Sequence, residues 1–243
     1  MLKFILTCEH GGNRIPLEYR SYFLTHQDLL QSHRGYDIGA LDIFGEMVRQ
    51  LKPEFSRYST VSRLLIELNR SIGNPNLFSD ISKNFSQAHK DRIVELYYQP
   101  YREACENIML AWAEKNHTIL HISVHTFTPV LDGEERKADI GLLYDPKRNG
   151  EKECCKLWKE EIEALDKNYK VRLNYPYQGT SDGITTYFRK KFSDAQYIGI
   201  ELEVNQKYLD ANASASVKAS ITQLIIESLR KVLHTWRTQL ETV

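Results

Sequence analysis

Short apolar runs alternate with longer amphipathic segments along this chain of 243 residues, and this alternation indicates its fold class. The short runs are typical of buried strands and fall near residues 3–8, 55–68, 118–124, 139–144, 169–173 and 196–204. The longer segments carry apolar residues at helical spacing and fall at residues 37–51, 90–115, 151–165 and 213–238. Strands that alternate with helices, without a long linker or repeat, predict a single α/β domain over residues 1–243.

Two of the strand-like runs end in histidines. The first leads to His10, which is followed by a Gly-Gly turn that leaves space beside the imidazole. In the second, period-two alternation places His121, Ser123 and His125 on one face. Ligands bind beyond the carboxyl ends of the strands in open α/β sheets, so we expect His10 and His125 to meet there. Metal binding is a chemical reason to bring two imidazoles together.

A third apolar run, residues 197–206, carries the carboxylates Glu201 and Glu203 on one strand face. An ionised carboxylate in a low-dielectric strand must pair, bind a metal or shift its pKa upward, and these conditions also produce a general base. Glu203 lies nearer the end of the strand and is the candidate general base. The alternative is an edge strand with both carboxylates in water.

The strand-like segment Ser62–Arg70 ends in an adjacent asparagine and arginine. Arginine offers a planar, permanently charged and bidentate grip on carboxylate oxygens, and the amide of Asn69 adds a further hydrogen bond. The pattern therefore predicts a site for an acidic ligand. The alternative is that Arg63 and Arg70 pair with Glu67 or with a surface acid.

In their order along the chain, these segments resemble the N-formylglutamate amidohydrolases, relatives of the zinc carboxypeptidases and aspartoacylases. The likeness runs through Glu9-His10-Gly11-Gly12 with Ile15-Pro16, Asp37-Ile38-Gly39-Ala40, Ser62-Arg63 with Leu68-Asn69-Arg70, Val124-His125-Thr126, Asn174-Tyr175-Pro176-Tyr177-Gln178-Gly179 and Glu203-Val204-Asn205-Gln206. The resemblance implies a phosphorylase/hydrolase-like, three-layer α/β/α fold with a mixed, mostly parallel central sheet, as in zinc carboxypeptidases. It also implies a Zn²⁺-dependent amidohydrolase that cleaves N-acylated acidic amino acids, with N-formyl-L-glutamate as the expected substrate and formate and glutamate as products.

The resemblance further implies a role for each matching residue. Zinc ligands would be His10, Asp37 and His125, the general base Glu203, and the substrate clamp Arg63, Asn69 and Arg70. The third ligand stays open, because the carboxypeptidase relatives take a glutamate ligand from a His-x-x-Glu turn, and Asn13 stands at that position here. Glu9 is the alternative to Asp37, although a regular strand points Glu9 and His10 to opposite faces. Asp37 itself precedes a helix-like run, where a purely helix-starting role is the competing interpretation.

Three loops are candidates for contact with the substrate. Residues 174–186 are punctuated by proline and glycine and contain Tyr177, expected to donate a hydrogen bond to the oxyanion or to cover the pocket. Residues 128–139 contain Arg136, expected to reach the substrate, although a charged run of this kind is usually a solvated loop. Residues 71–90 are polar, broken by proline, and form a candidate lid.

Two other functions remain open on this sequence. The same metal site would serve a carboxypeptidase-like hydrolase of a short peptide or of another N-acyl amino acid. The clamp residues indicate an acidic substrate but do not identify its acyl group. Alternatively, the chain is a non-catalytic relative that binds the ligand. Assays of hydrolysis and of metal content separate these possibilities.

Composition argues against several classes of partner. Lys and Arg number 32 and Asp and Glu also 32, so the chain lacks the basic excess typical of nucleic-acid-binding proteins. No run approaches the roughly 18 to 20 apolar residues that span a bilayer, and the N-terminus carries no long apolar signal segment. The four cysteines show no Cys-x-x-Cys spacing and indicate free thiols. We therefore expect a cytoplasmic protein whose partner is a small acidic molecule, and the sequence leaves its oligomeric state open.

Overall fold

The computed structural model describes residues 1–241, which form a six-stranded sheet in the order β2-β1-β3-β8-β6-β7 and a separate two-stranded sheet of β4 and β5. The strands of the large sheet are β1 (Leu2–Cys8), β2 (Phe55–Tyr58), β3 (Thr118–Phe127), β6 (Ile140–Leu143), β7 (Val171–Leu173) and β8 (Tyr197–Asn205), and the small sheet pairs β4 (Val130–Leu131) with β5 (Glu134–Glu135). Strands β2, β1, β3 and β8 are parallel, whereas β6 is antiparallel to β8 and parallel to β7. The sheet is therefore mixed and mostly parallel, as expected.

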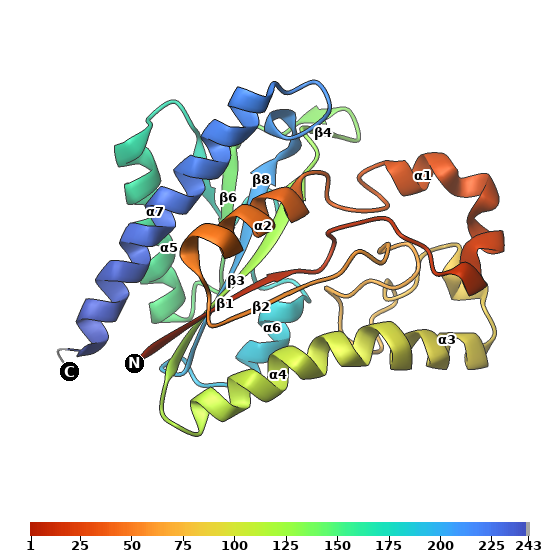
Figure 1. The fold of residues 1–243 in the computed structure, drawn as a ribbon, viewed down its shortest axis with the longest axis horizontal. Helices are drawn as coiled ribbons and strands as arrows, with labels where there is room; N and C mark the ends of the chain where they lie inside the picture. The colour runs from red at the N-terminus through yellow and green to blue at the C-terminus, as the bar shows by residue number, and fades with distance from the viewer. Residues whose placement is uncertain (242–243) are drawn as a thin grey trace.

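Helices cover both faces of this sheet. They are η1 (Leu17–His26), α1 (Gln27–Gln31), α2 (Ala40–Leu51), η2 (Ser82–Asn84), α3 (Gln87–Ile93), η3 (Val94–Tyr98), α4 (Gln99–Ala113), α5 (Asn149–Leu165), α6 (Ile184–Arg189), η4 (Gln206–Tyr208) and α7 (Ala215–Glu241). Helices α2, α5 and α7 lie on one side of the sheet, and α4 and α6 lie on the other (Figure 1). This arrangement confirms the three-layer α/β/α fold.

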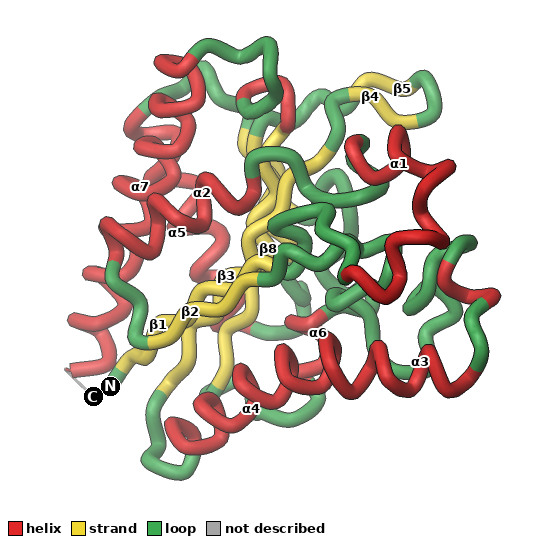
Figure 2. The backbone as a smooth tube through the Cα atoms, turned by 45° about the vertical axis from the view of Figure 1, so that its right-hand side comes forward, coloured by secondary structure: helices red, strands yellow, loops and turns green. Residues whose placement is uncertain are grey.

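The period-two pattern of β3 separates the core from the polar face of the sheet. Leu120, Ile122 and Val124 are fully buried in the cluster shared with α2, α5 and α7. His121, Ser123 and His125 point to the opposite face, toward the layer that contains α4 and α6. Long loops gather in that layer, between the sheet and helices α1, α3 and α4 (Figure 2). Polar strand residues therefore meet loop residues on this side.

The expected strand over residues 55–68 is too long, because β2 ends at Tyr58 and turns follow. Leu64, Leu65 and Ile66 are buried, but residues 62–70 form turns and belong to no strand of the sheet. Instead, the hydroxyl oxygen of Ser62 accepts a hydrogen bond from the Leu64 amide at 3.2 Å and supports a turn. This segment is apolar because it is buried in the layer that contains α4 and α6.

The helical expectations are correct for α2, α5 and α7 apart from their ends. The segment expected as one helix over 90–115 is α3, a π-helical turn (η3) and α4 in succession. Other helical elements lie outside the expectations: η1 with α1, the short η2 and η4, and α6, which begins at the end of the predicted loop 174–186 and continues to Arg189. These are short elements whose packing, not their periodicity, stabilises them.

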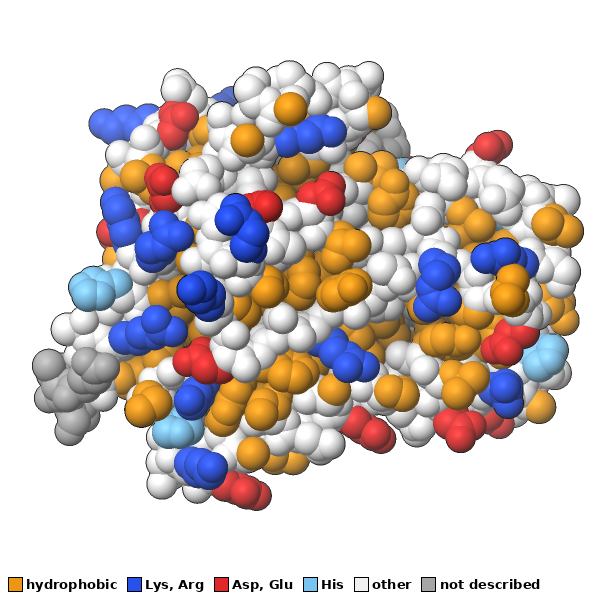
Figure 3. Space-filling model, in the orientation of Figure 1, with side chains coloured by type: hydrophobic (Ala, Val, Ile, Leu, Met, Phe, Trp, Pro, Cys, Tyr) orange, Lys and Arg blue, Asp and Glu red, His pale blue; other side chains and the backbone are white. Residues whose placement is uncertain are grey.

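Within residues 1–241, none of the helices combines the length and the apolarity that a membrane span requires. On the face seen in Figure 3, Lys and Arg side chains lie interspersed with Asp and Glu side chains. This mixture agrees with the formal net charge of zero.

Candidate active site

The candidate site lies beyond the carboxyl ends of β1, β3 and β8. His10 follows β1, while His125 on β3 is in register with Glu203 on β8. The imidazole centroids of His10 and His125 are 4.9 Å apart. Asp37 reaches the same place because its backbone amide donates a hydrogen bond to the His10 carbonyl at 3.0 Å. Three segments distant in sequence therefore bring two imidazoles and a carboxylate together.

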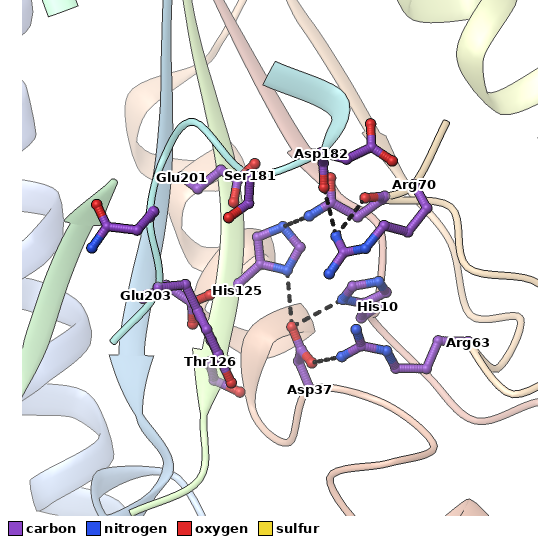
Figure 4. A pocket seen from close by; sticks show the side chains of 13 residues that line it. His10, Asp37, Arg63, Arg70, His125, Thr126, Ser181, Asp182, Glu201 and Glu203 are labelled. Atoms are coloured by element: carbon purple, nitrogen blue, oxygen red, sulfur yellow. Dashed lines mark hydrogen bonds and ion pairs between the residues drawn. The ribbon is translucent and has the colours of Figure 1, made fainter. Parts of the chain in front are cut away.

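His10, Asp37 and His125 present their side-chain atoms to one another. Oδ2 of Asp37 lies 3.2 Å from Nδ1 of His10 and 2.9 Å from Nδ1 of His125. All three ligand-type atoms lie within 4.8 Å of one another, and all three residues are buried. Both imidazoles point at Asp37 (Figure 4). A convergence of two nitrogens and one carboxylate oxygen is the donor set of a three-ligand catalytic zinc site.

The remaining polar atom of His10 and of Asp37 is held by a second residue. Nε2 of His10 bonds Oε1 of Glu67, and Nη1 of Arg63 bonds Oδ1 of Asp37 at 3.2 Å. Arg63 also donates to Oε2 of Glu67, at 2.8 Å from Nε and 2.5 Å from Nη2. Carboxylates that accept the outer N–H of an imidazole are typical of metal sites, because they select the tautomer and fix the ring.

Glu9 and Ser123 support His125 in the same way. Nε2 of His125 lies 2.8 Å from the Ser123 hydroxyl and 3.2 Å from Oε2 of Glu9. The Ser123 hydroxyl donates to Oε2 of Glu9 at 2.5 Å, and the Tyr101 hydroxyl donates to Oε1 at 2.8 Å. Both oxygens of Glu9 are thus engaged behind the imidazole, on the side away from Asp37. This geometry favours Asp37 over Glu9 as the third ligand-type group.

Two other residues that the sequence analysis named lie away from the triad of His10, Asp37 and His125. The amide nitrogen of Asn13, at the position of the glutamate in His-x-x-Glu, donates to the Leu30 carbonyl at 3.0 Å. His121 bonds the hydroxyls of Thr7 and Tyr197, both at 2.7 Å. Burial lowers the pKa of His121 to about 4, so it is a neutral, satisfied core residue.

The charges around the triad favour a cation. Burial alone would raise the pKa of Asp37, but His10, His125 and Arg63 outweigh it and hold that pKa below its ordinary value. Burial alone would lower the pKa of His125, but Asp37 and Glu9 outweigh it and raise that pKa. Buried carboxylates that draw positive charge onto an imidazole would equally stabilise a metal dication.

Glu203 lines the same cavity as the triad and has a buried oxygen without a hydrogen-bond partner among the described residues. Its side chain is buried, and this oxygen is Oε2. Burial, together with Asp37 and Glu201, raises the pKa of Glu203 to about 8, partly offset by His125. Gly141 leaves the space, since a Cβ there would lie 3.2 Å from the Glu203 Cβ and 2.0 Å from the Tyr175 carbonyl oxygen. A buried, unpaired carboxyl group with a raised pKa is suited to proton transfer.

The two arginines differ in where their donors point. Within residues 1–241, the side chain of Arg63 donates to Glu67 and Asp37, so the alternative pairing with Glu67 is correct for this arginine. Nη1 of Arg70 donates to the carbonyls of Asn69 and Asp182, both at 2.8 Å. Nε and Nη2 of Arg70 make no hydrogen bond in the same part of the chain, and the side chain lines the cavity. Arg70 is therefore the arginine with donors free for an anion.

Asn69 connects the clamp segment to α6. Its Oδ1 accepts the Ile184 amide at 2.6 Å, and this donor fixes the orientation of the side-chain amide. Nδ2 lies 3.4 Å from Nε2 of His125. When Nε2 of His125 carries a proton that points at Glu9 and Ser123, it cannot accept a hydrogen bond from Nδ2 of Asn69. Nδ2 is then available to a ligand.

Eight of the nine predicted site residues line one cavity of about 180 Å³: His10, Asp37, Arg63, Asn69, Arg70, His125, Tyr177 and Glu203. The ninth, Arg136, does not line it. Its guanidinium lies 4.9 Å from the centre of the Tyr177 ring and 5.8 Å from the centre of the Phe127 ring. Contact between Arg136 and the substrate stays a prediction.

Sequence reasoning missed Glu67 and Asp182 as site residues. Glu67 bonds His10, Arg63 and the Asn69 amide, and its signal in the sequence is a lone carboxylate between buried apolar residues. Asp182 lines the cavity and bonds the loop that follows Arg70. Nothing local distinguishes Asp182 from an ordinary turn aspartate.

Comparison with known proteins assigns the chain to a family. The family model described as N-formylglutamate amidohydrolase matches residues 2–209, which include every residue of the cavity. The chain belongs to the N-formylglutamate amidohydrolase family. The match ends shortly before α7, so this last helix is outside the part that the family model describes.

Two solved structures share the fold of this family member. A gene product from Agrobacterium tumefaciens is 23% identical, with a TM-score of 0.79 over 97% of this chain and 92% of that one. An N-formylglutamate amidohydrolase from Ralstonia eutropha is 17% identical, with a TM-score of 0.71 over 96% of this chain and 94% of that one. No curated protein matches the chain significantly.

Proposed function

We propose that this protein is a zinc-dependent amidohydrolase that cleaves the amide bond of an N-acylated acidic amino acid, with N-formyl-L-glutamate as substrate. Family membership supports the reaction class. The observation that carries the proposal is one cavity lined both by the triad of His10, Asp37 and His125 and by Arg70, which has free donors. A metal-type site joined to an anion grip fits an acidic amide substrate.

The donor set fits zinc. Tetrahedral zinc with ligands at about 2.0 to 2.1 Å brings their donor atoms to roughly 3.4 Å from one another. The oxygen of Asp37 lies 3.2 and 2.9 Å from the nitrogens of His10 and His125, and all three donor atoms lie within 4.8 Å of one another, near the spacing that zinc requires. Bound zinc would polarise the amide carbonyl and lower the pKa of a water to about 7.

The residues of the chain carry the remaining steps. Glu203 takes a proton from the attacking water and returns it to the leaving nitrogen. Arg70 and Nδ2 of Asn69 hold a substrate carboxylate, which positions the carbonyl over the triad. Tyr177 closes one side of the cavity and excludes water, while Arg63 holds Asp37 in orientation and adds positive charge for the acidic substrate.

Formate release from N-formyl-L-glutamate tests the proposal. The comparison set contains N-acetyl-L-glutamate, N-formyl-L-leucine and a dipeptide that ends in glutamate. We expect kcat/KM to be highest for N-formyl-L-glutamate. Activity confined to the dipeptide would replace the proposal by a carboxypeptidase-like reaction, and absence of both zinc and turnover would indicate a non-catalytic binding protein.

The location proposed for this enzyme is the cytoplasm. Cys8, Cys105, Cys154 and Cys155 are all buried free thiols, as suits a reducing compartment.

Replacing Arg70 by Lys is expected to lower kcat/KM for N-formyl-L-glutamate about 10- to 100-fold, because an ammonium group cannot reproduce a bidentate, charge-assisted grip. Steady-state kinetics on the zinc-loaded variant measure the effect. Arg172 provides a matched control, because it is an exposed arginine whose guanidinium stacks on Tyr175 at 5.0 Å. Unchanged kinetics in Arg70→Lys would move the anion grip elsewhere.

Zinc is expected to stabilise the folded protein. An ion that binds only the folded state at about 100 times its Kd contributes roughly 2.7 kcal/mol, which raises the Tm of a chain of this size by about 5 °C. Thermal unfolding of chelator-stripped protein, with and without added zinc, measures the shift. The same shift in His125→Ala would show that zinc binds elsewhere.

A further inference from the structure

Arg70 is held from two directions. Its backbone carbonyl accepts hydrogen bonds from the Tyr98 hydroxyl at 2.7 Å and from Nη2 of Arg102 at 3.1 Å. Arg102 is itself buried, with its guanidinium 5.2 Å from the Tyr98 ring and 5.1 Å from the Tyr187 ring. The main chain of Arg70 is thus supported by η3 and α4, independently of the loops around the cavity.

The guanidinium of Arg70 depends on two other contacts. Its Nη1 donates to the carbonyl of the neighbouring Asn69 and to the Asp182 carbonyl on the loop that precedes α6, both at 2.8 Å (Figure 4). A guanidinium on a flexible stem takes many rotamers in solution, and fixed acceptors reduce their number. The Asn69 carbonyl belongs to the adjacent residue, so the Asp182 backbone is the acceptor from a distant segment that directs the free Nη2 and Nε of Arg70.

The carboxylate of Asp182 fixes that backbone to the loop after Arg70. Oδ2 accepts the Ser71 amide at 2.9 Å and Nδ2 of Asn74 at 2.6 Å, and Oδ1 accepts the Ser71 hydroxyl at 2.6 Å. Burial alone would raise the pKa of Asp182, but the bonds from Ser71 and Asn74 outweigh it and lower that pKa. These three bonds join two loops that are 111 residues apart in sequence.

We propose that Asp182 is a positioning residue for the anion grip: its carboxylate joins the loop of residues 71–74 to the loop before α6 and thereby orients the Arg70 guanidinium in the cavity. The inference rests on the proposed function, in which Arg70 holds a substrate carboxylate. If the Arg70 side chain is already oriented before the substrate binds, less conformational entropy is lost on binding. The effect therefore appears as a higher substrate affinity.

Asp182→Ala removes all three bonds and is expected to raise KM for N-formyl-L-glutamate about tenfold, with kcat changed less than threefold. Asp182→Asn is expected to raise KM much less than Asp182→Ala does, because its amide oxygen can accept from Ser71 and Asn74 while its NH₂ donates to the Ser71 hydroxyl. Asp80→Ala is the matched control, since Asp80 is an exposed carboxylate that pairs with Lys83 at the surface. Equal damage in Asp182→Asn and Asp182→Ala would overturn the positioning role.

A double-mutant cycle with Arg70→Ala separates positioning from a general structural effect. If Asp182 acts through Arg70, Asp182→Ala adds less than a twofold change in KM to the Arg70→Ala protein. Additive effects in this cycle would contradict the proposal. Ser71→Ala provides a milder variant that loses only the hydroxyl bond, and we expect it to raise KM two- to threefold.

Hydrogen exchange tests the loop contact without any substrate. Amides of residues 71–74 are expected to exchange at least tenfold faster in Asp182→Ala than in the unmodified protein, with α4 unchanged. Equal exchange rates of these amides in Asp182→Ala and in the unmodified protein would overturn the inference, even if the enzyme hydrolyses N-formyl-L-glutamate. Faster exchange in a protein that hydrolyses no N-acyl amino acid would instead contradict the proposed function and leave the loop contact intact.

Discussion

Glu203→Gln is expected to lower kcat about 10²- to 10⁴-fold while the zinc content stays unchanged. Glutamine keeps the shape of the side chain but cannot accept and return a proton. Glu203 is also the cavity carboxyl group whose Oε2 has no partner among the described residues, so few other contacts depend on its charge. Single-turnover kinetics and metal analysis of the same preparation measure the two quantities.

Glu201→Gln is the matched control for this substitution. Glu201 lines the same cavity, but its Oε1 accepts the Thr185 hydroxyl at 2.9 Å, so its role is structural and the loss of kcat should be less than tenfold. A near-normal rate in Glu203→Gln would assign the base elsewhere.

The pH profile gives a second measure of Glu203. A general base acts in its ionised form, so kcat/KM should rise with pH as Glu203 loses its proton. Burial and neighbouring carboxylates raise the pKa of Glu203 to about 8 in the metal-free protein. Bound zinc favours the ionised form, so the rise should lie below that pH and should disappear in Glu203→Gln.

Asp37→Ala and His125→Ala are each expected to lose stoichiometric zinc and to reduce turnover to background. Each substitution removes one of three ligand-type atoms, and the two donors that remain are too few to hold a catalytic zinc in its usual coordination. Metal analysis after gel filtration, with melting temperatures to verify folding, measures the loss. Full zinc content in Asp37→Ala would assign the third ligand to another residue.

Glu9→Gln distinguishes a ligand from a residue that supports one. Glu9 contacts Nε2 of His125, on the far side from Asp37, so its loss should weaken zinc affinity by only about 10- to 100-fold. Zinc titration with a competing chelator measures this difference. Complete loss of binding in Glu9→Gln, with binding retained in Asp37→Ala, would reverse the two assignments.

The convergence of His10 and His125 is predictable because strand patterns are local and the carboxyl ends of parallel strands share an edge. The same argument applies to Glu203, which is in register with His125 on the neighbouring strand. The prediction of a strand over residues 55–68 is correct only for Phe55–Tyr58, because burial produces an apolar run without strand geometry in the rest of that segment. The clamp arginines still line the cavity as expected, since that expectation does not depend on the secondary structure.

The sequence by itself determined the fold class, the family and most of the charged side chains that gather at one edge of the sheet. These follow from local periodicity and from motifs whose order along the chain is specific. Only the tertiary structure decided which donors are free, because hydrogen-bond partners such as Glu67 for Arg63 and Asp182 for Arg70 are chosen by three-dimensional proximity. A hydrogen bond depends on distances of a few tenths of an ångström, and no pattern along the chain carries that information.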